Sequence, residues 1–115
     1  MKLYAKSERT ISTSRLLDTF RSGGCKVGKV GEWCKWKEIY DGGKVQLKMT
    51  VYEVKTGILT AYLISDTLRM VAAPMVECKQ EVLNWLKEHG YKPEKQWYIE
   101  DYGMSEETWD AWTEE

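Results

Sequence analysis

The sequence of 115 residues holds two prolines, three cysteines, one histidine and no long apolar run. No segment approaches the roughly 18 consecutive apolar residues of a membrane-spanning helix, and Met1–Arg9 has no apolar core typical of a secretory signal. The three cysteines, Cys25, Cys34 and Cys78, lie far apart, which favours free thiols in a reducing compartment over a disulfide framework. We therefore expect a cytoplasmic protein.

His89 is the only histidine, so any histidine-based general base would have to come from this position. Together with the three cysteines it could supply four zinc ligands, but no two cysteines show the short spacing of structural zinc sites. His89 precedes Gly90 at the end of a predicted helix, where an imidazole ring can stabilise exposed carbonyl groups. We expect a capping role for His89, no metal, no cofactor and no catalytic residue, although a cysteine nucleophile paired with His89 remains an alternative.

Residues 23–30, Gly-Gly-Cys-Lys-Val-Gly-Lys-Val, match the glycine spacing of a phosphate-binding loop as far as the lysine. Val30 stands where such a loop has the serine or threonine that binds magnesium. The segment also leaves a predicted helix and enters a predicted strand, which is the reverse of the usual order. We interpret it as a glycine-rich connector.

The alternation of apolar and polar residues predicts an α+β fold. Val45, Leu47, Met49 and Val51 alternate strictly with polar residues, and a turn at 41–43 precedes them. We expect one domain over residues 1–115, with a small antiparallel meander of three to five strands packed against two helices, and a short C-terminal helix. The expected strands are at 2–6, 33–40, 44–54, 58–65 and 96–101; Leu3 or the C-terminal segment could add an edge strand. The expected helices are at 14–22, 75–89 and from Ser105 onwards.

The chain has a single phenylalanine beside six tryptophans and seven tyrosines, so most rings carry a polar atom that suits an interface. Charge is divided between the two ends. Residues 1–93 carry 16 basic and 10 acidic side chains, a formal charge of +6, whereas residues 94–115 carry one lysine and eight carboxylates, a formal charge of −7. The net formal charge of −1 is therefore the sum of a basic part and an acidic part, and we expect a dipolar molecule.

The acidic C-terminal segment, residues 94–115, interleaves carboxylates with aromatic rings, unlike simple disordered acidic tails. Trp109 and Trp112, three residues apart on a helix, could anchor in a partner's pockets while the carboxylates complement a basic surface. The predicted partner-binding residues are Glu100, Asp101, Glu106, Glu107, Trp109, Asp110 and Trp112. The alternative is that these tryptophans pack on the protein's own core and have no role in binding.

In composition, residues 94–115 resemble the small phage-encoded anti-restriction and anti-CRISPR inhibitors. These inhibitors occupy a nucleic-acid groove of their target with carboxylates. The resemblance implies a non-enzymatic phage or mobile-element inhibitor that docks on a basic, nucleic-acid-handling protein by mimicry of nucleic acid.

A second hypothesis is a nucleic-acid-binding module that uses the basic, Trp-containing meander. Interleaved cations and rings can follow a phosphate backbone while stacking on bases. The candidate residues are Arg15, Arg21, Lys26, Lys29, Trp33, Lys35, Trp36 and Lys37. Lysines on an exposed sheet face are also ordinary solubilising residues.

Overall fold

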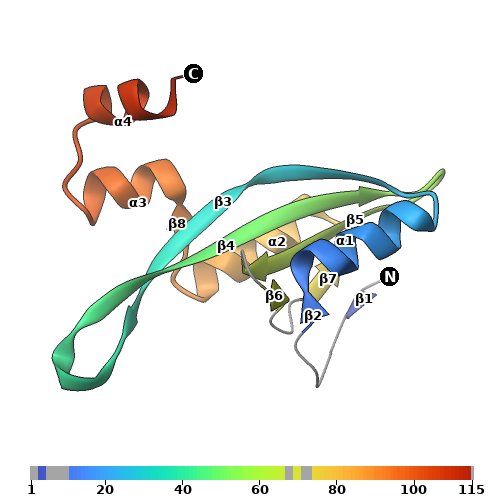
Figure 1. Cartoon of the computed structure of the whole chain (residues 1–115), viewed down its shortest axis with the longest axis horizontal. Helices are drawn as coiled ribbons and strands as arrows, with labels where there is room; N and C mark the ends of the chain where they lie inside the picture. Colours follow the sequence, from blue (N-terminus) through green and yellow to red (C-terminus); the bar gives the residue numbers. More distant parts are fainter. Residues whose placement is uncertain (1–2, 5–10, 67–68, 71–73, 115) are drawn as a thin grey trace.

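A long antiparallel hairpin runs through the whole structure, a computed structural model that describes residues 3–4, 11–66, 69–70 and 74–114 (Figure 1). Its strands, β3 (Lys26–Glu38) and β4 (Lys44–Lys55), pair from Lys26↔Lys55 to Glu38↔Lys44. A 3-10 turn, η1 (Tyr40–Gly42), joins them at the tip. The strict alternation predicted for β4 is confirmed, since Met49, Val51 and Lys48 follow the pleat of this strand.

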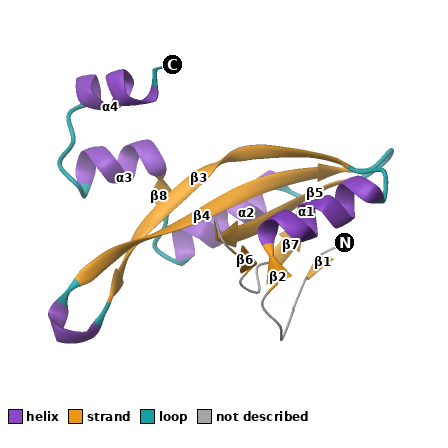
Figure 2. Ribbon diagram, in the orientation of Figure 1, coloured by secondary structure: helices purple, strands orange, loops and turns teal. Residues whose placement is uncertain are grey.

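The hairpin forms the centre of a six-stranded antiparallel sheet with the order β1-β7-β5-β4-β3-β8 (Figure 2). The strands beside it are β5 (Thr60–Asp66), β7 (Pro74–Val76), β1 (Leu3–Tyr4) and, at the other edge, β8 (Lys92–Pro93). A separate two-stranded sheet pairs β2 (Ile11–Ser12) with β6 (Arg69–Met70). The predicted three-strand meander is therefore β3-β4-β5, and the expected edge strand at Leu3 is present.

Helices cover both faces of the sheet. Helix α2 (Lys79–Glu88) packs with Val82 and Leu86 on the face that carries Val51 and Ile64. Helix α1 (Thr13–Ser22) packs on the opposite face. That second core contains Leu17, Val54, Ala61 and Leu63 as its buried residues. Two helices on a predominantly antiparallel sheet confirm the predicted α+β class.

The ends of both helices follow the predicted signals. Gly24 has φ +87° after α1, and Gly90 has φ +81° after α2, a conformation that costs glycine little. His89 is the C-cap of α2: its Nδ1–H donates to the Trp85 carbonyl at 2.7 Å, and its ring stacks on the Trp85 ring at 3.9 Å. The capping position predicted for His89 is therefore confirmed.

The prediction that residues 23–30 form a glycine-rich connector is wrong for most of this segment, because residues 26–30 belong to a strand. Strand β3 already begins at Lys26, seven residues before the predicted start at 33, and its pairing with β4 shifts between Lys29 and Gly31. The shift is a β-bulge that leaves Val30 without a partner. A Cβ on Gly31 would lie 3.2 Å from the Trp33 ring, so the glycine here reflects a close approach.

Two further predicted elements differ from the structure. Pro74 begins strand β7, not a helix, because Val76 pairs with Tyr62 and enters the core; α2 starts only at Lys79. The strand expected at 96–101 is a helix, α3 (Glu94–Glu100). The last helix, α4 (Glu106–Thr113), is confirmed, with Ser105 as its N-cap.

Part of the first expected strand, residues 2, 5 and 6, lies outside the described residues. None of the helices in the described part of the chain combines the length and the apolar character needed to cross a membrane.

We expect Leu63→Ala and Ile64→Ala each to lower the free energy of unfolding by about 3 kcal/mol, because both side chains are fully buried and leave cavities. The two residues face opposite helices but share β5, so both variants should unfold in one transition followed by urea denaturation. Val45→Ala, on an exposed part of β4, should change stability by less than about 0.5 kcal/mol. Two separate transitions would contradict a single cooperative unit.

Candidate functional site

The C-terminal helices are tied to the sheet by one tryptophan. Trp97 is the only buried residue of α3, with 2% of its surface exposed, and its ring lies 4.7 Å from the Trp36 ring on β3. Pro93 ends β8 and immediately precedes α3, and Glu94 lies at the positive end of the helix. Trp97 therefore anchors α3 on the sheet.

A cluster of charged side chains stands beside this contact. The Lys48 ammonium lies 2.7 Å from Glu32 Oε2 and 2.9 Å from Glu94 Oε1, and Lys29 pairs with the other oxygen of Glu32 at 2.7 Å. These residues come from β4, β3 and the first turn of α3. Lys48 consequently joins both strands of the hairpin to α3.

Burial raises the pKa of Glu94, and a hydrogen bond shared with Glu32 raises it further, although Lys48 acts in the opposite direction. Burial would also raise the pKa of Glu32, but hydrogen bonds from Glu94, Lys29 and Lys48 outweigh it and lower that pKa to about 2. Burial opposes the charge of Lys48, yet its two carboxylate partners raise the pKa of this lysine overall.

Helix α4 is held to α3 mainly by rings. The Tyr98 ring lies 5.3 Å from that of Trp109 and 5.2 Å from that of Trp112, and the two tryptophan rings are 5.5 Å apart. Ser105 Oγ accepts a hydrogen bond from the Thr108 N–H at 3.1 Å and so caps the helix. Figure 1 shows α4 lying on the far side of α3 from the sheet.

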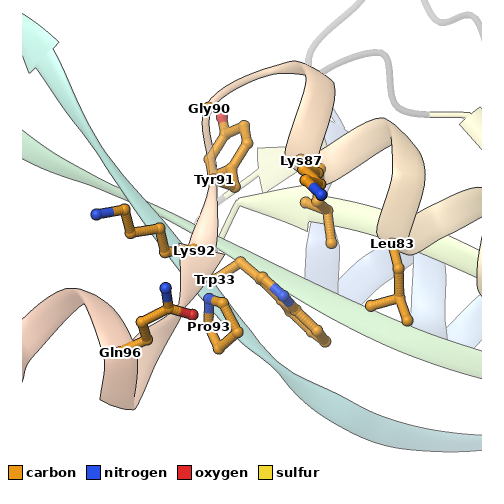
Figure 3. A pocket seen from close by; sticks show the side chains of 9 residues that line it. Trp33, Leu83, Lys87, Gly90, Tyr91, Lys92, Pro93 and Gln96 are labelled. Carbon is orange, nitrogen blue, oxygen red and sulfur yellow. The ribbon is translucent and has the colours of Figure 1, made fainter.

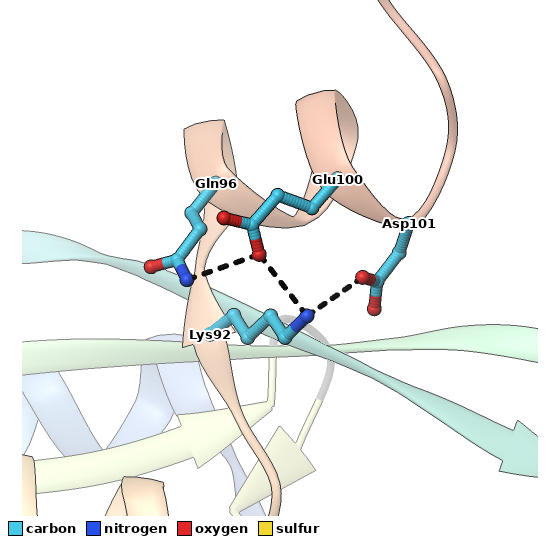
Figure 4. Close-up of polar contacts among 4 residues, drawn as sticks. All are labelled: Lys92, Gln96, Glu100 and Asp101. Atoms are coloured by element: carbon cyan, nitrogen blue, oxygen red, sulfur yellow. Dashed lines mark hydrogen bonds and ion pairs between the residues drawn. The ribbon is translucent and has the colours of Figure 1, made fainter.

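Two lysines pair with several of the acidic residues. Lys92 Nζ lies 2.7 Å from Asp101 Oδ1 and 3.3 Å from Glu100 Oε2 (Figure 4). Lys95 Nζ lies 3.2 Å from Glu106 Oε1 and 3.7 Å from Asp110 Oδ1. The side chains around Lys95 are 46–69% exposed, so these contacts are solvent-screened.

The predicted partner-binding residues lie on α3, on α4 and in the segment between these helices. We call this region the acidic aromatic face and define it as Glu100, Asp101, Tyr102, Glu106, Glu107, Trp109, Asp110 and Trp112. Within it Tyr102 is 62% exposed and Trp112 57% exposed, whereas Trp109 is half-buried. Glu107 is exposed and pairs with no residue in the described part of the chain. One ring is thus partly internal, and two remain open to solvent.

The eight residues of the nucleic-acid hypothesis do not form one patch. Lys35 and Lys37 share a face of β3 with Trp33, while Trp36 points to the opposite face by ordinary alternation. Lys29 also points to that opposite face, because the bulge at Val30 shifts the alternation. Lys35 donates to the His89 carbonyl at 3.3 Å, with its ammonium 4.5 Å from the centre of the Tyr91 ring. On α1, Arg21 lies 3.6 Å from Asp18 and Arg15 is exposed, and Lys26 begins β3.

The cysteines lie in three different environments. Cys34 is fully buried and accepts a hydrogen bond from Gln46 at 3.2 Å, whereas Cys25 is half-buried and Cys78 exposed. Burial, followed by the nearby Glu94 carboxylate, raises the pKa of the Cys34 thiol to about 11. A thiol of this kind is a poor nucleophile at neutral pH.

Sequence reasoning missed the residues that organise this face: Lys48, Lys92, Lys95, Tyr98 and Tyr102. Lys95 is the only cation of the acidic segment, which is a signal that could have identified it. The Lys48 contacts depend on the β3–β4 register and on the docking of α3, for which the sequence carries no local signal.

No protein-family model matches the chain, and neither a curated protein nor a solved structure does.

We expect Lys48→Met to lower the free energy of unfolding by about 2 kcal/mol at pH 7, because Glu94 then has no cation and lies beside the Glu32 carboxylate, which keeps only Lys29 as its partner. In the native protein the lowered pKa of Glu32 adds stability above its unfolded value of about 4.3, and this is lost as the pH falls towards 2. As the pH falls, the deficit of the variant should begin to shrink above about pH 4.5, because the pKa of Glu94 is raised and its protonation removes the repulsion. Urea denaturation of the native protein and the variant at several pH values measures this difference in the free energy of unfolding.

Lys44→Met is the matched control, because Lys44 points to the same face of β4 but is exposed and outside the cluster. It should change stability by less than about 0.5 kcal/mol at every pH. A Lys48→Met deficit that is independent of pH would contradict the role given to Lys48.

Proposed function

We propose that this chain is a non-enzymatic binding protein whose acidic aromatic face docks on a basic surface of a nucleic-acid-handling protein, as an inhibitor of the anti-restriction or anti-CRISPR type. The observation that carries the proposal is the exposed Trp112 ring on α4, a helix that also carries the exposed carboxylates Glu106, Glu107 and Asp110. Exposed indole rings surrounded by charge are typical anchors of protein interfaces.

Helix α4 contributes little to the core of the protein, which supports a role outside folding. It buries none of its own residues completely, and its contacts are with α3. A well-capped helix that carries two tryptophans and does not complete the core has a surface available for a partner.

The intramolecular lysines do not remove the attraction for a basic partner. Residues 92–114 hold Lys92 and Lys95 against seven carboxylates, which leaves a formal charge of −5. Exposed ion pairs contribute roughly 0–1 kcal/mol, so arginines or lysines of a partner can replace or join these contacts at small cost. The remaining field accelerates association with a cationic surface.

A nucleic-acid-binding groove is the partner surface that fits this chemistry best. Such grooves carry arginines and lysines for phosphates and aromatic or apolar surfaces for bases. Carboxylates would take the place of phosphates, and the Trp112 and Tyr102 rings the place of bases. The free cysteines agree with a cytoplasmic location for both partners, which we propose with the function.

The alternative, direct nucleic-acid binding by the meander, has weaker support because its residues lie on both faces of β3 and several have acidic or aromatic partners. Retention on single-stranded and duplex oligonucleotides at low salt would favour this alternative if Lys35→Glu and Lys37→Glu abolish it.

We expect the immobilised protein to retain nucleic-acid-binding proteins from a bacterial lysate at low salt and to release them at high salt or on addition of duplex DNA. Trp112→Ala should weaken retention of the same protein at least about tenfold, a typical effect of losing an anchor. Glu106→Lys with Asp110→Lys should weaken it further and flatten the salt dependence. Quantitative mass spectrometry of the retained fraction measures both effects.

Glu88→Lys on α2 is the matched charge control, because this carboxylate is exposed but far from α4 in the chain. It should leave retention within about twofold of the native protein, a negligible change in free energy. Retention that survives Trp112→Ala and the double charge reversal unchanged would refute docking through the acidic aromatic face.

A further inference from the structure

The β3–β4 hairpin extends beyond the sheet as a two-stranded arm. Strand β8 pairs with β3 only at Trp33 and Cys34, and β5 pairs with β4 only from Met49 onwards. Residues 35–47 are therefore flanked by no other strand of the described chain. Figure 2 shows this arm projecting away from both α1 and α2.

The tip of the arm presents apolar side chains to solvent. Tyr40 is 95% exposed and Ile39 49% exposed, although the turn beneath them is well defined. The Ile39 N–H donates to the Gly43 carbonyl at 2.9 Å, and Asp41 holds a left-handed conformation with φ +69°. A structured turn that exposes a tyrosine beside a carboxylate is suited to insertion into a cavity of another molecule.

A cleft of about 530 Å³ lies at the base of the same arm, next to Trp33 (Figure 3). Helix α2 contributes Leu83, Leu86 and Lys87, and the segment that follows contributes the other walls. Those walls are Gly90, Tyr91, Lys92, Pro93 and Gln96. Leu86 and Tyr91 are buried, so the floor is apolar, while Lys87 is exposed and has no partner among the described residues.

We propose that the tip of the arm in one copy of this chain occupies the cleft of a second copy, and that the exchange is reciprocal. The chemistry matches, because the cleft offers an apolar floor beside the Lys87 ammonium and the tip offers the Tyr40 ring beside the Asp41 carboxylate. A volume of this size suits a small ligand and therefore one or two side chains.

The arrangement of the two features favours a closed pair. The cleft lies beside Trp33 and the arm begins two residues later, so two arms that run side by side in opposite directions place each tip at the base of the other. Such a contact uses the same surface in both copies and closes by two-fold symmetry. It involves no residue of the acidic aromatic face, and it stands or fails independently of the proposed docking function.

The contact area is small, so we expect a weak dimer with a dissociation constant on the order of tens of micromolar. Sedimentation velocity from low micromolar to millimolar concentration should show a shift from monomer to dimer. Tyr40→Ser, at the tip, and Lys87→Glu, at the cleft, should each weaken the dimer at least about tenfold. Both side chains are exposed, and circular dichroism should show unchanged folding.

Mixing the two variants tests reciprocity. Tyr40→Ser keeps a native cleft and Lys87→Glu keeps a native tip, so a heterodimer of the two variants has one native contact. An equimolar mixture should therefore form more dimer than either variant alone at the same total concentration. Ile58→Ser is the matched control, because Ile58 is a fully exposed apolar residue on another turn and should leave the dimer unchanged. A native protein that stays monomeric at millimolar concentration, or a dimer that Tyr40→Ser does not weaken, would overturn the proposal.

Discussion

The position of α3, and of α4 packed on it, depends on the packing of Trp97 against Trp36. A buried tryptophan removes roughly 150–250 Å² from water, which is worth about 4–6 kcal/mol at 25 cal/mol per Å². Trp97 Nε1 has no acceptor in the described part of the chain, and a buried unpaired N–H costs about 1–3 kcal/mol. Ring burial therefore prevails, and α3 stays on the sheet.

The Lys48 cluster complements this contact by fixing where α3 begins. Trp97 supplies non-directional attraction, whereas the contact of Lys48 with Glu94 depends on geometry and selects one position of the helix along β3. Ion pairs of this kind add little net stability but penalise alternative arrangements, because a displaced α3 would separate Glu94 from Lys48. The orientation of the acidic aromatic face follows from both contacts together.

Local signals were sufficient where a segment's own chemistry decides its structure. The alternation in β4, the glycines after α1 and α2, and the Ser105 cap were predicted correctly because each acts over a few residues. Tertiary contacts decided the rest. Residues 94–100 form a helix because Trp97 packs on Trp36 while Tyr98 packs on α4. Residues 74–76 form a strand because Val76 pairs with Tyr62.

The predicted basic patch illustrates a limit of sequence reasoning. Without the bulge at Val30, strict alternation would place Lys29 on the same face as Lys35 and Lys37; the extra residue sends it to the opposite face, towards Glu32. The predicted partner-binding residues are close together in the sequence, so their proximity in the fold depends less on strand register. Exposure was not predictable, since Trp97 and Trp112 have similar acidic neighbours and only the fold buries one of them.

The two proposed contacts use separate surfaces, which has a consequence for binding. An exchange of arms would leave α4 free in each copy, so a dimer would carry two acidic aromatic faces in a fixed relation. A partner with two basic sites at a matching distance would bind the second face at a high effective concentration, and affinity could rise by two or more orders of magnitude without any new contact. A partner with a single groove would gain nothing from dimerisation. The stoichiometry of the complex therefore distinguishes these two kinds of partner.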